Sequence, residues 1–257
     1  MLKLLLIRHG ESTGNRDRRM SGRDDTGLTP VGQQQCQQLG SWLHRHGYRP
    51  DHIYSSPLPR ALQSLEGLLS PWQWLWPQNL TIAPHLKSVP GHELVAVQTA
   101  PLQTAGPQPS PTLTLCPRLQ EFDAGILTGL TWAEAKARFP DLCEQLETTL
   151  EWRPIPEAET PQQGRNRAQQ FISQLLTQHT NQDQVWVMSH QWILEHLMAC
   201  LLGSDRTWQL PMPNTALFEF WLDRDRWSAG AVERTVSNHW QIKRFGDRPH
   251  LADSDQP

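Results

Sequence analysis

The chain has 257 residues, which is enough for one large α/β domain or for a domain that carries an insertion. Hydrophobic residues make up 37% of it and 12 tryptophans add apolar bulk, so the composition is that of a globular protein. The formal net charge of −3 argues against a broadly basic surface, and therefore against nucleic acid as a partner. The apolar run Leu4–Ile7 is too short for a signal peptide and no segment approaches a membrane span, so we expect a cytoplasmic protein without a membrane partner.

The cysteines indicate a reducing compartment. None forms a Cys-x-x-Cys pair, and no histidine has a spacing typical of zinc ligands. We therefore expect four free thiols and no metal site, at Cys36, Cys116, Cys143 and Cys200.

The first part of the chain alternates between short apolar runs and amphipathic segments. Residues 2–7 predict a buried parallel strand. Thr29, followed by proline, is typical of a helix N-cap, and Gly47 of the end of that helix. Residues 53–55 predict a second strand, and a helix follows Pro57.

Residues 70–111 have a different texture. They are rich in proline and glutamine, show little helical periodicity, and are too poor in aliphatic residues for a core of their own. We interpret this region as an insertion that serves as a candidate lid over a site. Its three tryptophans are expected to pack rather than to form a binding surface: Trp72, Trp74 and Trp76.

The second part of the chain returns to alternation. Strands are predicted at 113–115, 185–188 and 216–222. Capping boxes that begin at Thr131 and Thr160 predict two helices, the first of them halted by Pro140. A further helix follows the strand at 185–188 and ends near Gly203.

This alternation predicts an α/β protein with three layers, α/β/α, around a mostly parallel central sheet. We expect a single domain over residues 1–245, with the insertion at about 70–111, and a flexible tail over residues 246–257.

Ionisable residues follow several of the predicted strands. His9 and His190 come directly after strands, Arg8 precedes His9, Arg60 opens a helix after a strand, and Glu121 follows another strand. Ligands of such sheets bind outside the carboxyl ends of the strands, so these five groups are expected to converge. Arginines neutralise and orient a phosphate, a neutral imidazole attacks phosphorus, and a carboxylic acid protonates a leaving oxygen. The set therefore suits the cleavage of a phosphate ester.

At this point the sequence resembles the histidine phosphatase (phosphoglycerate mutase-like) superfamily, and its phosphatase branch in particular. The matching segments occur in family order and cover roughly residues 1–69 and 113–222. They are Arg8-His9-Gly10-Glu11-Ser12 with Asn15, Gly27-Leu28-Thr29-Pro30-Val31-Gly32, Ser55-Ser56-Pro57-Leu58-Pro59-Arg60-Ala61, Leu119-Gln120-Glu121-Phe122-Asp123-Ala124-Gly125, Ser189-His190, and Asn214.

The resemblance implies a role for each matched residue. His9 is the phosphate acceptor, while Arg8, Arg60 and His190 complete the phosphate pocket. Glu121 is the proton donor and later the general base. The family is metal-independent, so neither a metal nor another cofactor is expected. The remaining substrate-binding candidates are Asn15, Ser21, Gly22 and Gln191.

Three features depart from the family pattern. The second histidine is usually followed by glycine, whereas Gln191 follows it here and is expected to reshape the pocket. A Gly-Glu-Ser segment of the family appears as Gly164-Arg165-Asn166, which exchanges a negative charge for a positive one. The third departure is the insertion, which is longer than in compact members.

Several assignments stay open at this stage. Asp123 and Glu93 compete with Glu121 as the acid. His85 and His92 in the insertion are more readily explained as exposed loop residues than as substrate contacts. A basic run either steers an anionic substrate or is a solvated face: Arg16, Arg18, Arg19 and Arg23.

We therefore expect a phosphoric monoester hydrolase acting on a small phosphorylated metabolite, such as phosphoserine or a sugar phosphate, through a phosphohistidine. The sequence Phe122-Asp123-Ala124-Gly125 resembles phosphatases more than mutases. The alternatives are a cofactor-dependent phosphoglycerate mutase and a non-catalytic module that binds a phosphate ligand. Many members of the family form homodimers, so a homodimer is an expectation as well, although no segment identifies its surface.

Overall fold

The structure is a computed structural model. It describes the chain apart from residues 25, 77–97, 105–108, 150, 228–238 and 252–257. Within the described residues no helix has both the length and the apolar composition needed to cross a membrane. The four cysteines are all free.

The centre of the fold is a mixed sheet. In the described part of the chain seven strands form it, in the order β4-β6-β2-β7-β1-β8-β9. The four neighbouring strands β6, β2, β7 and β1 are parallel, whereas β8 and β4 run antiparallel to their neighbours. The strands of this sheet are β1 (Leu2–Arg8), β2 (His52–Ser55), β4 (Gln98–Pro101), β6 (Thr112–Leu115), β7 (Gln184–Ser189), β8 (Leu217–Leu222) and β9 (Trp240–Asp247).

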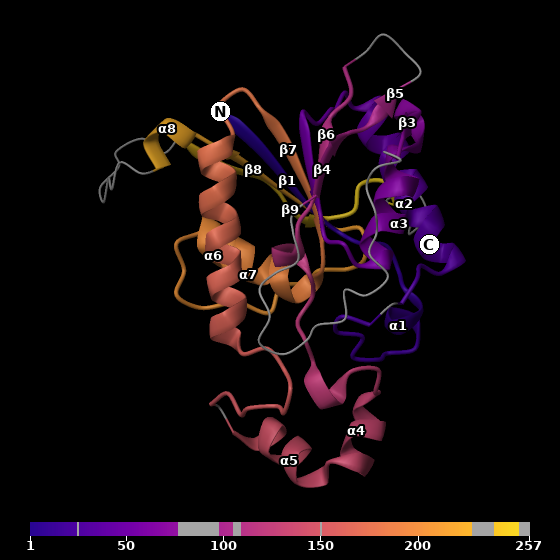
Figure 1. The fold of residues 1–257 in the computed structure, drawn as a ribbon, viewed down its shortest axis with the longest axis vertical. Coiled ribbons are helices and arrows are strands. Elements are labelled where there is room, and N and C mark those ends of the chain that lie inside the picture. The colour runs from indigo at the N-terminus through magenta and orange to yellow at the C-terminus, as the bar shows by residue number, and fades with distance from the viewer. Residues whose placement is uncertain (25, 77–97, 105–108, 150, 228–238, 252–257) are drawn as a thin grey trace.

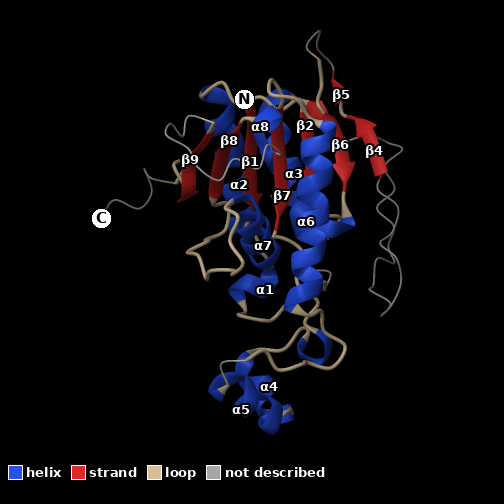
Figure 2. Cartoon of the chain, turned by 90° about the vertical axis from the view of Figure 1, so that its left-hand side faces the viewer, coloured by secondary structure: helices blue, strands red, loops and turns tan. Residues whose placement is uncertain are grey.

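Helices cover both faces of the sheet, as Figures 1 and 2 show: α6 and α7 lie on one face, and α2 and α3 on the other. The predicted three-layer α/β/α architecture is confirmed. The α-helices are α1 (Thr13–Arg16), α2 (Pro30–Arg45), α3 (Pro59–Leu69), α4 (Trp132–Arg138), α5 (Pro140–Thr148), α6 (Pro161–Gln178), α7 (Gln191–Leu201) and α8 (Arg224–Trp227). Short 3₁₀ turns lie at Ser70–Trp72, Pro117–Leu119 and Gly125–Leu127.

Local sequence signals explain where these helices begin. The hydroxyl of Thr29 accepts the backbone N–H of Gly32 at the start of α2. Thr131 and Thr160 form the predicted capping boxes of α4 and α6. Pro140 does end α4, but it also begins α5, because proline is well suited to the first position of a helix.

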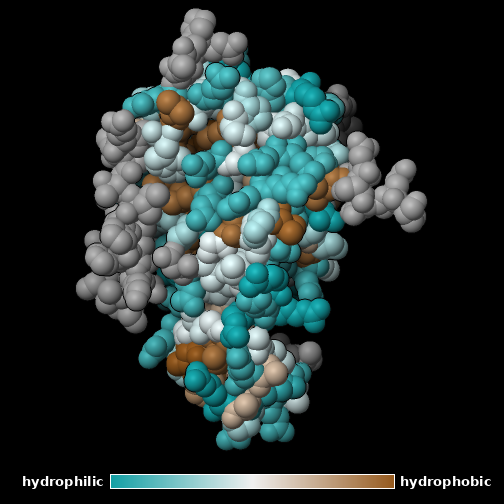
Figure 3. All heavy atoms as spheres, turned by 90° about the vertical axis from the view of Figure 1, so that its right-hand side faces the viewer, coloured by the Kyte–Doolittle hydropathy of each residue, from teal (hydrophilic) through white to brown (hydrophobic). Residues whose placement is uncertain are grey.

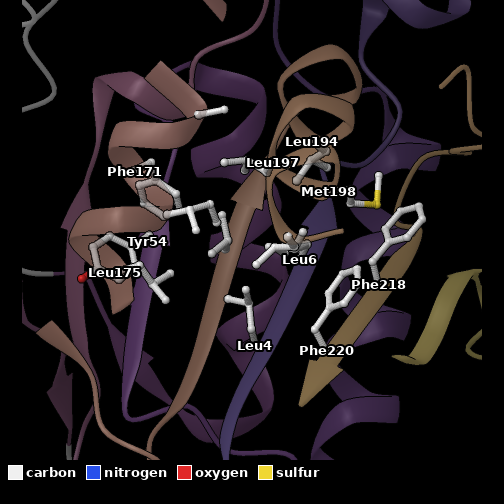
Figure 4. Close-up of a cluster of buried hydrophobic side chains, with 14 of the residues drawn as sticks. Leu4, Leu6, Tyr54, Phe171, Leu175, Leu194, Leu197, Met198, Phe218 and Phe220 are labelled. Atoms are coloured by element: carbon white, nitrogen blue, oxygen red, sulfur yellow. The ribbon is translucent and has the colours of Figure 1, made fainter. Parts of the chain in front are cut away.

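Two apolar cores lie on the two faces of the sheet. Alternate side chains of the buried strand β1 point to opposite faces, so Leu4 and Leu6 join one core while Leu5 and Ile7 join the other. Figure 4 shows the first core, in which Phe171 of α6 and Leu197 of α7 pack over the strands. The two cores hold α3, which follows β2, and α7, which follows β7, and so they position the residues at the first turns of both helices.

The insertion contributes to the sheet. Its strand β4 pairs with β6 at the sheet edge, and a separate ribbon forms from β3 (Trp74–Leu75) and β5 (Gln103–Thr104). Trp72 stacks on Trp74 with ring centroids 5.2 Å apart, which is the packing role predicted for these residues. Residues 77–97, and with them Glu93, His85 and His92, lie outside the described residues, so the lid remains a prediction.

The predicted tail boundary at 246 is wrong. Gly246 and Asp247 belong to β9, which pairs with β8 and was not predicted. Beyond this strand His250 approaches Thr215, with Nε2 and Oγ1 2.9 Å apart. Residues 252–257 lie outside the described part of the chain.

A small helical lobe lies beyond the carboxyl end of the sheet. It contains α4 and α5, at the bottom of Figures 1 and 2, and has its own apolar cluster around Ala135 and Cys143. The face in Figure 3 is mainly hydrophilic with scattered hydrophobic areas, one of them at the lower end of the molecule. This lobe contributes one wall of the cavity described next.

Candidate active site

Parallel strands bring the two histidines together. Arg8 is the last residue of β1 and pairs in register with Ser189, the last residue of β7, so His9 and His190 leave adjacent strands side by side. Their ring centroids are 5.0 Å apart. The N–H of Ser56, just after β2, donates to the carbonyl of Met188 and so anchors the segment that leads to Arg60.

A cavity of about 370 Å³ opens at this edge of the sheet. Eight of the nine residues expected at the site line it, and His190 lies behind His9. These eight are Arg8, His9, Asn15, Ser21, Gly22, Arg60, Glu121 and Gln191. The structure thus brings together residues that are up to 183 positions apart in the chain.

The His9 ring is held in one tautomer. Nδ1 lies 2.7 Å from the carbonyl oxygen of Gly10. Because a carbonyl only accepts, Nδ1 carries the proton and the lone pair is on Nε2. Burial, and then the charges of Arg60 and Arg8, hold the pKa of His9 well below its usual value. A neutral imidazole with a free Nε2 lone pair is the form that a nucleophile needs.

Glycine at position 10 allows this arrangement. A Cβ there would lie 2.6 Å from the carbonyl oxygen of Gly32 and 2.7 Å from Sγ of Cys36, both in α2. The bare backbone therefore packs against α2, and its N–H donates to Oγ of Ser64 in α3. The two helices on this face of the sheet fix the turn that carries His9.

His190 is fully buried behind the first histidine. Nε2 lies 2.7 Å from Oγ of Ser56, and Nδ1 is a buried atom with no hydrogen-bond partner among the described residues. Burial, followed by the charge of Arg60, lowers the pKa of His190 well below its usual value, so the ring is neutral in this state. A phosphate bound beside this ring would raise the pKa of His190, because a nearby negative charge favours the protonated imidazole.

Two arginines supply the positive charge. Arg60, at the first turn of α3, is 2% exposed and donates to the backbone carbonyls of Gly22 and Asp24 at 2.6 and 3.0 Å. Arg8 donates to the carbonyl of Met212 through Nη1, while its Nε is buried without a partner among the described residues. Buried polar atoms without partners are uncommon in proteins, so this Nε is a candidate donor to a ligand in the cavity.

The loop after His9 is tied to a distant segment. Asn15 accepts the backbone N–H of Ser12 at 3.1 Å, which closes the capping box of α1. The amide of Asn214 donates to the same Asn15 oxygen and to the carbonyl of His9, both at 3.1 Å. These bonds hold the Asn15 amide at the cavity wall.

Glu121 lies where the acid is expected. One carboxylate oxygen accepts the N–H of Phe122 at 2.9 Å, and the other lies 3.5 Å from the N–H of Trp192 in the first turn of α7. Asp123, its competitor, is absent from the cavity lining. It accepts the N–H of Gly125 and lies 3.7 Å from the guanidinium of Arg23. The geometry favours Glu121.

A buried ionic network fixes the backbone beside Glu121. Arg167 of α6 makes two bonds to the carboxylate of Glu159, at 2.6 and 2.9 Å. Its other donors reach the carbonyls of Gln120 and Glu121, at 2.5 and 3.3 Å. Arg23 also contacts Glu159, at 3.2 Å. Members of the basic run therefore have different roles: Arg23 belongs to the buried network, whereas Arg16 forms an exposed ion pair with its neighbour Asp17.

Sequence analysis named Arg19 within the basic run, with its role left open, and did not assign the remaining residues of the cavity. Arg19 lines it and pairs with Glu134 of α4 at 2.7 Å, and Glu195 lines it from α7. Gln191 and Glu195 are one turn apart, so their spacing after His190 could have indicated a shared face. The apolar wall comprises Met20, Phe122, Ala124, Leu127, Trp132, Leu146, Ile155 and Trp192.

The two sequence departures behave differently. Gln191 does line the cavity, as expected for a side chain at that position. Arg165 does not, because its guanidinium donates to the carbonyl of Ser204, just beyond the end of α7. The preceding Gly164 matters more, since a Cβ there would come within 2.0 Å of the Trp192 ring that forms the cavity wall.

The sequence also matches a family model. The model of the histidine phosphatase superfamily (branch 1) matches residues 4–88 and 95–235. The chain belongs to the histidine phosphatase superfamily. The prediction from the sequence is thereby confirmed, and the family places the chain among the phosphoric monoester hydrolases.

Solved structures of similar fold support the architecture. Bacillus stearothermophilus YhfR has a TM-score of 0.68 at 22% identity, with 98% of this chain and 100% of that chain covered. The phosphoserine phosphatase of Entamoeba histolytica, in complex with 3-phosphoglyceric acid, has a TM-score of 0.65 at 21% identity, with 98% of this chain and 100% of that chain covered. The α-ribazole phosphatase of Shigella flexneri has a TM-score of 0.64 at 20% identity, with 96% of each chain covered. At these identities the likeness concerns the fold.

Proposed function

We propose that this chain is a metal-independent phosphomonoesterase that hydrolyses a small phosphorylated metabolite through a phosphohistidine at His9. The observation that carries the proposal is the His9 ring itself: neutral, with its proton fixed on Nδ1 by Gly10 and its Nε2 lone pair beside two arginines. This is an activated nucleophile within a site for a phosphate dianion.

The reaction follows from these positions in two steps. Nε2 of His9 attacks phosphorus, the P–N bond forms, and the P–O bond to the leaving group breaks while Glu121 donates a proton to that oxygen. Water then attacks the phosphohistidine, Glu121 takes a proton from the water, and the P–N bond breaks to release inorganic phosphate. Arg8, Arg60 and the Nδ1 of His190 would bind the phosphoryl oxygens throughout.

The cavity limits the size of the substrate. A volume of about 370 Å³ admits a small metabolite such as phosphoserine or a sugar phosphate. The test is phosphate release from phosphoserine, 3-phosphoglycerate, sugar phosphates and p-nitrophenyl phosphate, with EDTA present. Release supports the proposal. Conversion of 3-phosphoglycerate to 2-phosphoglycerate without phosphate release would indicate a mutase, and inertness towards every ester would indicate a binding module.

The role of Glu121 gives a specific prediction. Glu121→Gln cannot donate a proton, so it should slow alkyl phosphates, which have poor leaving groups, by roughly 10²-fold. It should slow p-nitrophenyl phosphate only a few-fold, because nitrophenolate leaves without protonation. The values of kcat/KM on both ester classes measure this difference, because kcat/KM reports the transfer of the phosphoryl group to His9, whereas kcat also contains the hydrolysis step in which Glu121 is the base.

Asp123→Asn is the matched control, because Asp123 is bound to Gly125 and Arg23 rather than to the cavity. If Glu121→Gln slowed both ester classes equally, Glu121 would not be the acid. If Asp123→Asn alone showed the leaving-group dependence, the assignment would pass to Asp123.

A further inference from the structure

Two carboxylates share the cavity wall. Glu121 enters from the loop after the Pro117–Leu119 turn and Glu195 from α7. Within the described residues neither makes an ion pair with a lysine, arginine or histidine within 4 Å. Glu195 instead accepts the side-chain amide of Gln191 at 3.3 Å. The cavity wall therefore has two acidic side chains without a close ion-pair partner, beside the arginines that are expected to bind the phosphate.

The surroundings of Glu195 affect its pKa in opposite directions. Burial is the main cause that raises its pKa. Hydrogen bonds from the Gln191 side chain and the Leu210 backbone lower it, the charge of Glu121 raises it, and the charge of Arg8 lowers it. When a phosphate dianion binds Arg8, part of that opposing attraction is lost to the phosphate. A cation close to Glu195 would offset that loss, and no lysine, arginine or histidine of the described residues forms an ion pair with Glu195 within 4 Å.

The walls beside the carboxylates suit an organic cation. Phe122 and Trp192 line the same cavity with ring centroids 4.8 Å apart. Aromatic faces attract ammonium groups, and the apolar residues around them accommodate a short hydrocarbon spacer. A strongly hydrated metal ion finds no such advantage in apolar surroundings, whereas an alkylammonium does.

We infer that Glu195 is a specificity-determining residue that selects phosphate monoesters whose leaving group carries a protonated amine on a short spacer. The inference rests on the proposed function and narrows its substrate class. The phosphate binds at the arginines and histidines, while the ammonium lies against Glu195 at the wall formed by Trp192. Esters that carry a carboxylate at the same place are disfavoured, because the carboxylate of Glu195 already lies there.

Three esters of similar size test the inference: phosphoethanolamine with an ammonium, 2-hydroxyethyl phosphate without charge, and 2-phosphoglycolate with a carboxylate. For the wild type we expect kcat/KM to fall in that order. In Glu195→Gln, which keeps the size of the side chain, the preference for phosphoethanolamine over 2-hydroxyethyl phosphate should shrink by about tenfold. The discrimination against 2-phosphoglycolate should weaken as well.

Glu66→Gln is the matched control, since Glu66 makes the same change of charge on the exposed side of α3, outside the cavity. Its ratios should equal those of the wild type. The inference is overturned if the wild type hydrolyses p-nitrophenyl phosphate but does not prefer the amine, or if Glu195→Gln keeps the preference. If no ester is hydrolysed at all, the proposed function fails, and calorimetric titration with phosphoethanolamine and 2-hydroxyethyl phosphate then decides the role of Glu195 by the same comparison.

Discussion

Replacement of His9 by alanine is expected to reduce phosphate release by more than about 10³-fold, because the variant lacks the atom that accepts the phosphoryl group. The fold should persist. Among the described residues the His9 side chain makes one hydrogen bond, to the carbonyl of Gly10, and it lies at the cavity rather than within either apolar core. Initial rates on a good and a poor leaving group, together with the thermal midpoint, measure both expectations.

His44→Ala is the control for this variant. His44 is an exposed histidine of α2 that makes a T-shaped contact with Trp72 and does not line the cavity. It should keep the wild-type rate. Near-normal turnover by the His9 variant would show that another group attacks phosphorus, and unfolding of that variant would show that the histidine is structural.

The second large effect concerns stability. Arg167→Met should lower the free energy of unfolding by about 3 kcal/mol, because it leaves the carboxylate of Glu159 buried without its bidentate partner. The variant also loses the donors that hold the carbonyls of Gln120 and Glu121. We therefore expect a lower kcat in the fraction that remains folded. Urea denaturation followed by fluorescence and circular dichroism gives the first value.

Arg45→Met provides the comparison, since Arg45 lies exposed at the end of α2 and donates a hydrogen bond to the carbonyl of Ser41 within its own helix. Its effect on stability should stay within about 0.5 kcal/mol. An equally small effect in Arg167→Met would mean that Arg23, which also contacts Glu159, compensates fully for the lost guanidinium.

Local signals predicted most of the fold. Thr29, Thr131 and Thr160 are N-caps whose hydrogen bonds are short-range, so they can be recognised without tertiary context. The strand β9 was missed because its alternation of apolar and polar residues, which begins at Trp240 and Ile242, is broken before Phe245, where its pairing with β8 shifts register. The edge strand β4 was also missed, within a segment rich in glutamine and proline.

The residues of the candidate site that lie at strand ends could be predicted from the sequence. Arg8, His9 and His190 follow apolar strands that parallel pairing places side by side. Glu195 could not be recognised with equal ease, because it depends on the direction in which α7 leaves the sheet. Arg167 was beyond sequence reasoning, since its partners come from a loop about 47 residues earlier in the chain and from a carboxylate before its own helix.

The central claim is that His9 carries the phosphoryl group, and trapping that group tests it most directly. The protein is mixed with a hydrolysable ester, quenched in alkali within the first turnover, because the P–N bond of phosphohistidine is labile to acid, and digested for mass spectrometry. The account predicts an added phosphoryl group on the peptide that contains His9, absent from His9→Ala. Turnover with no phosphoryl group on that peptide, or with the group on another residue, would contradict it.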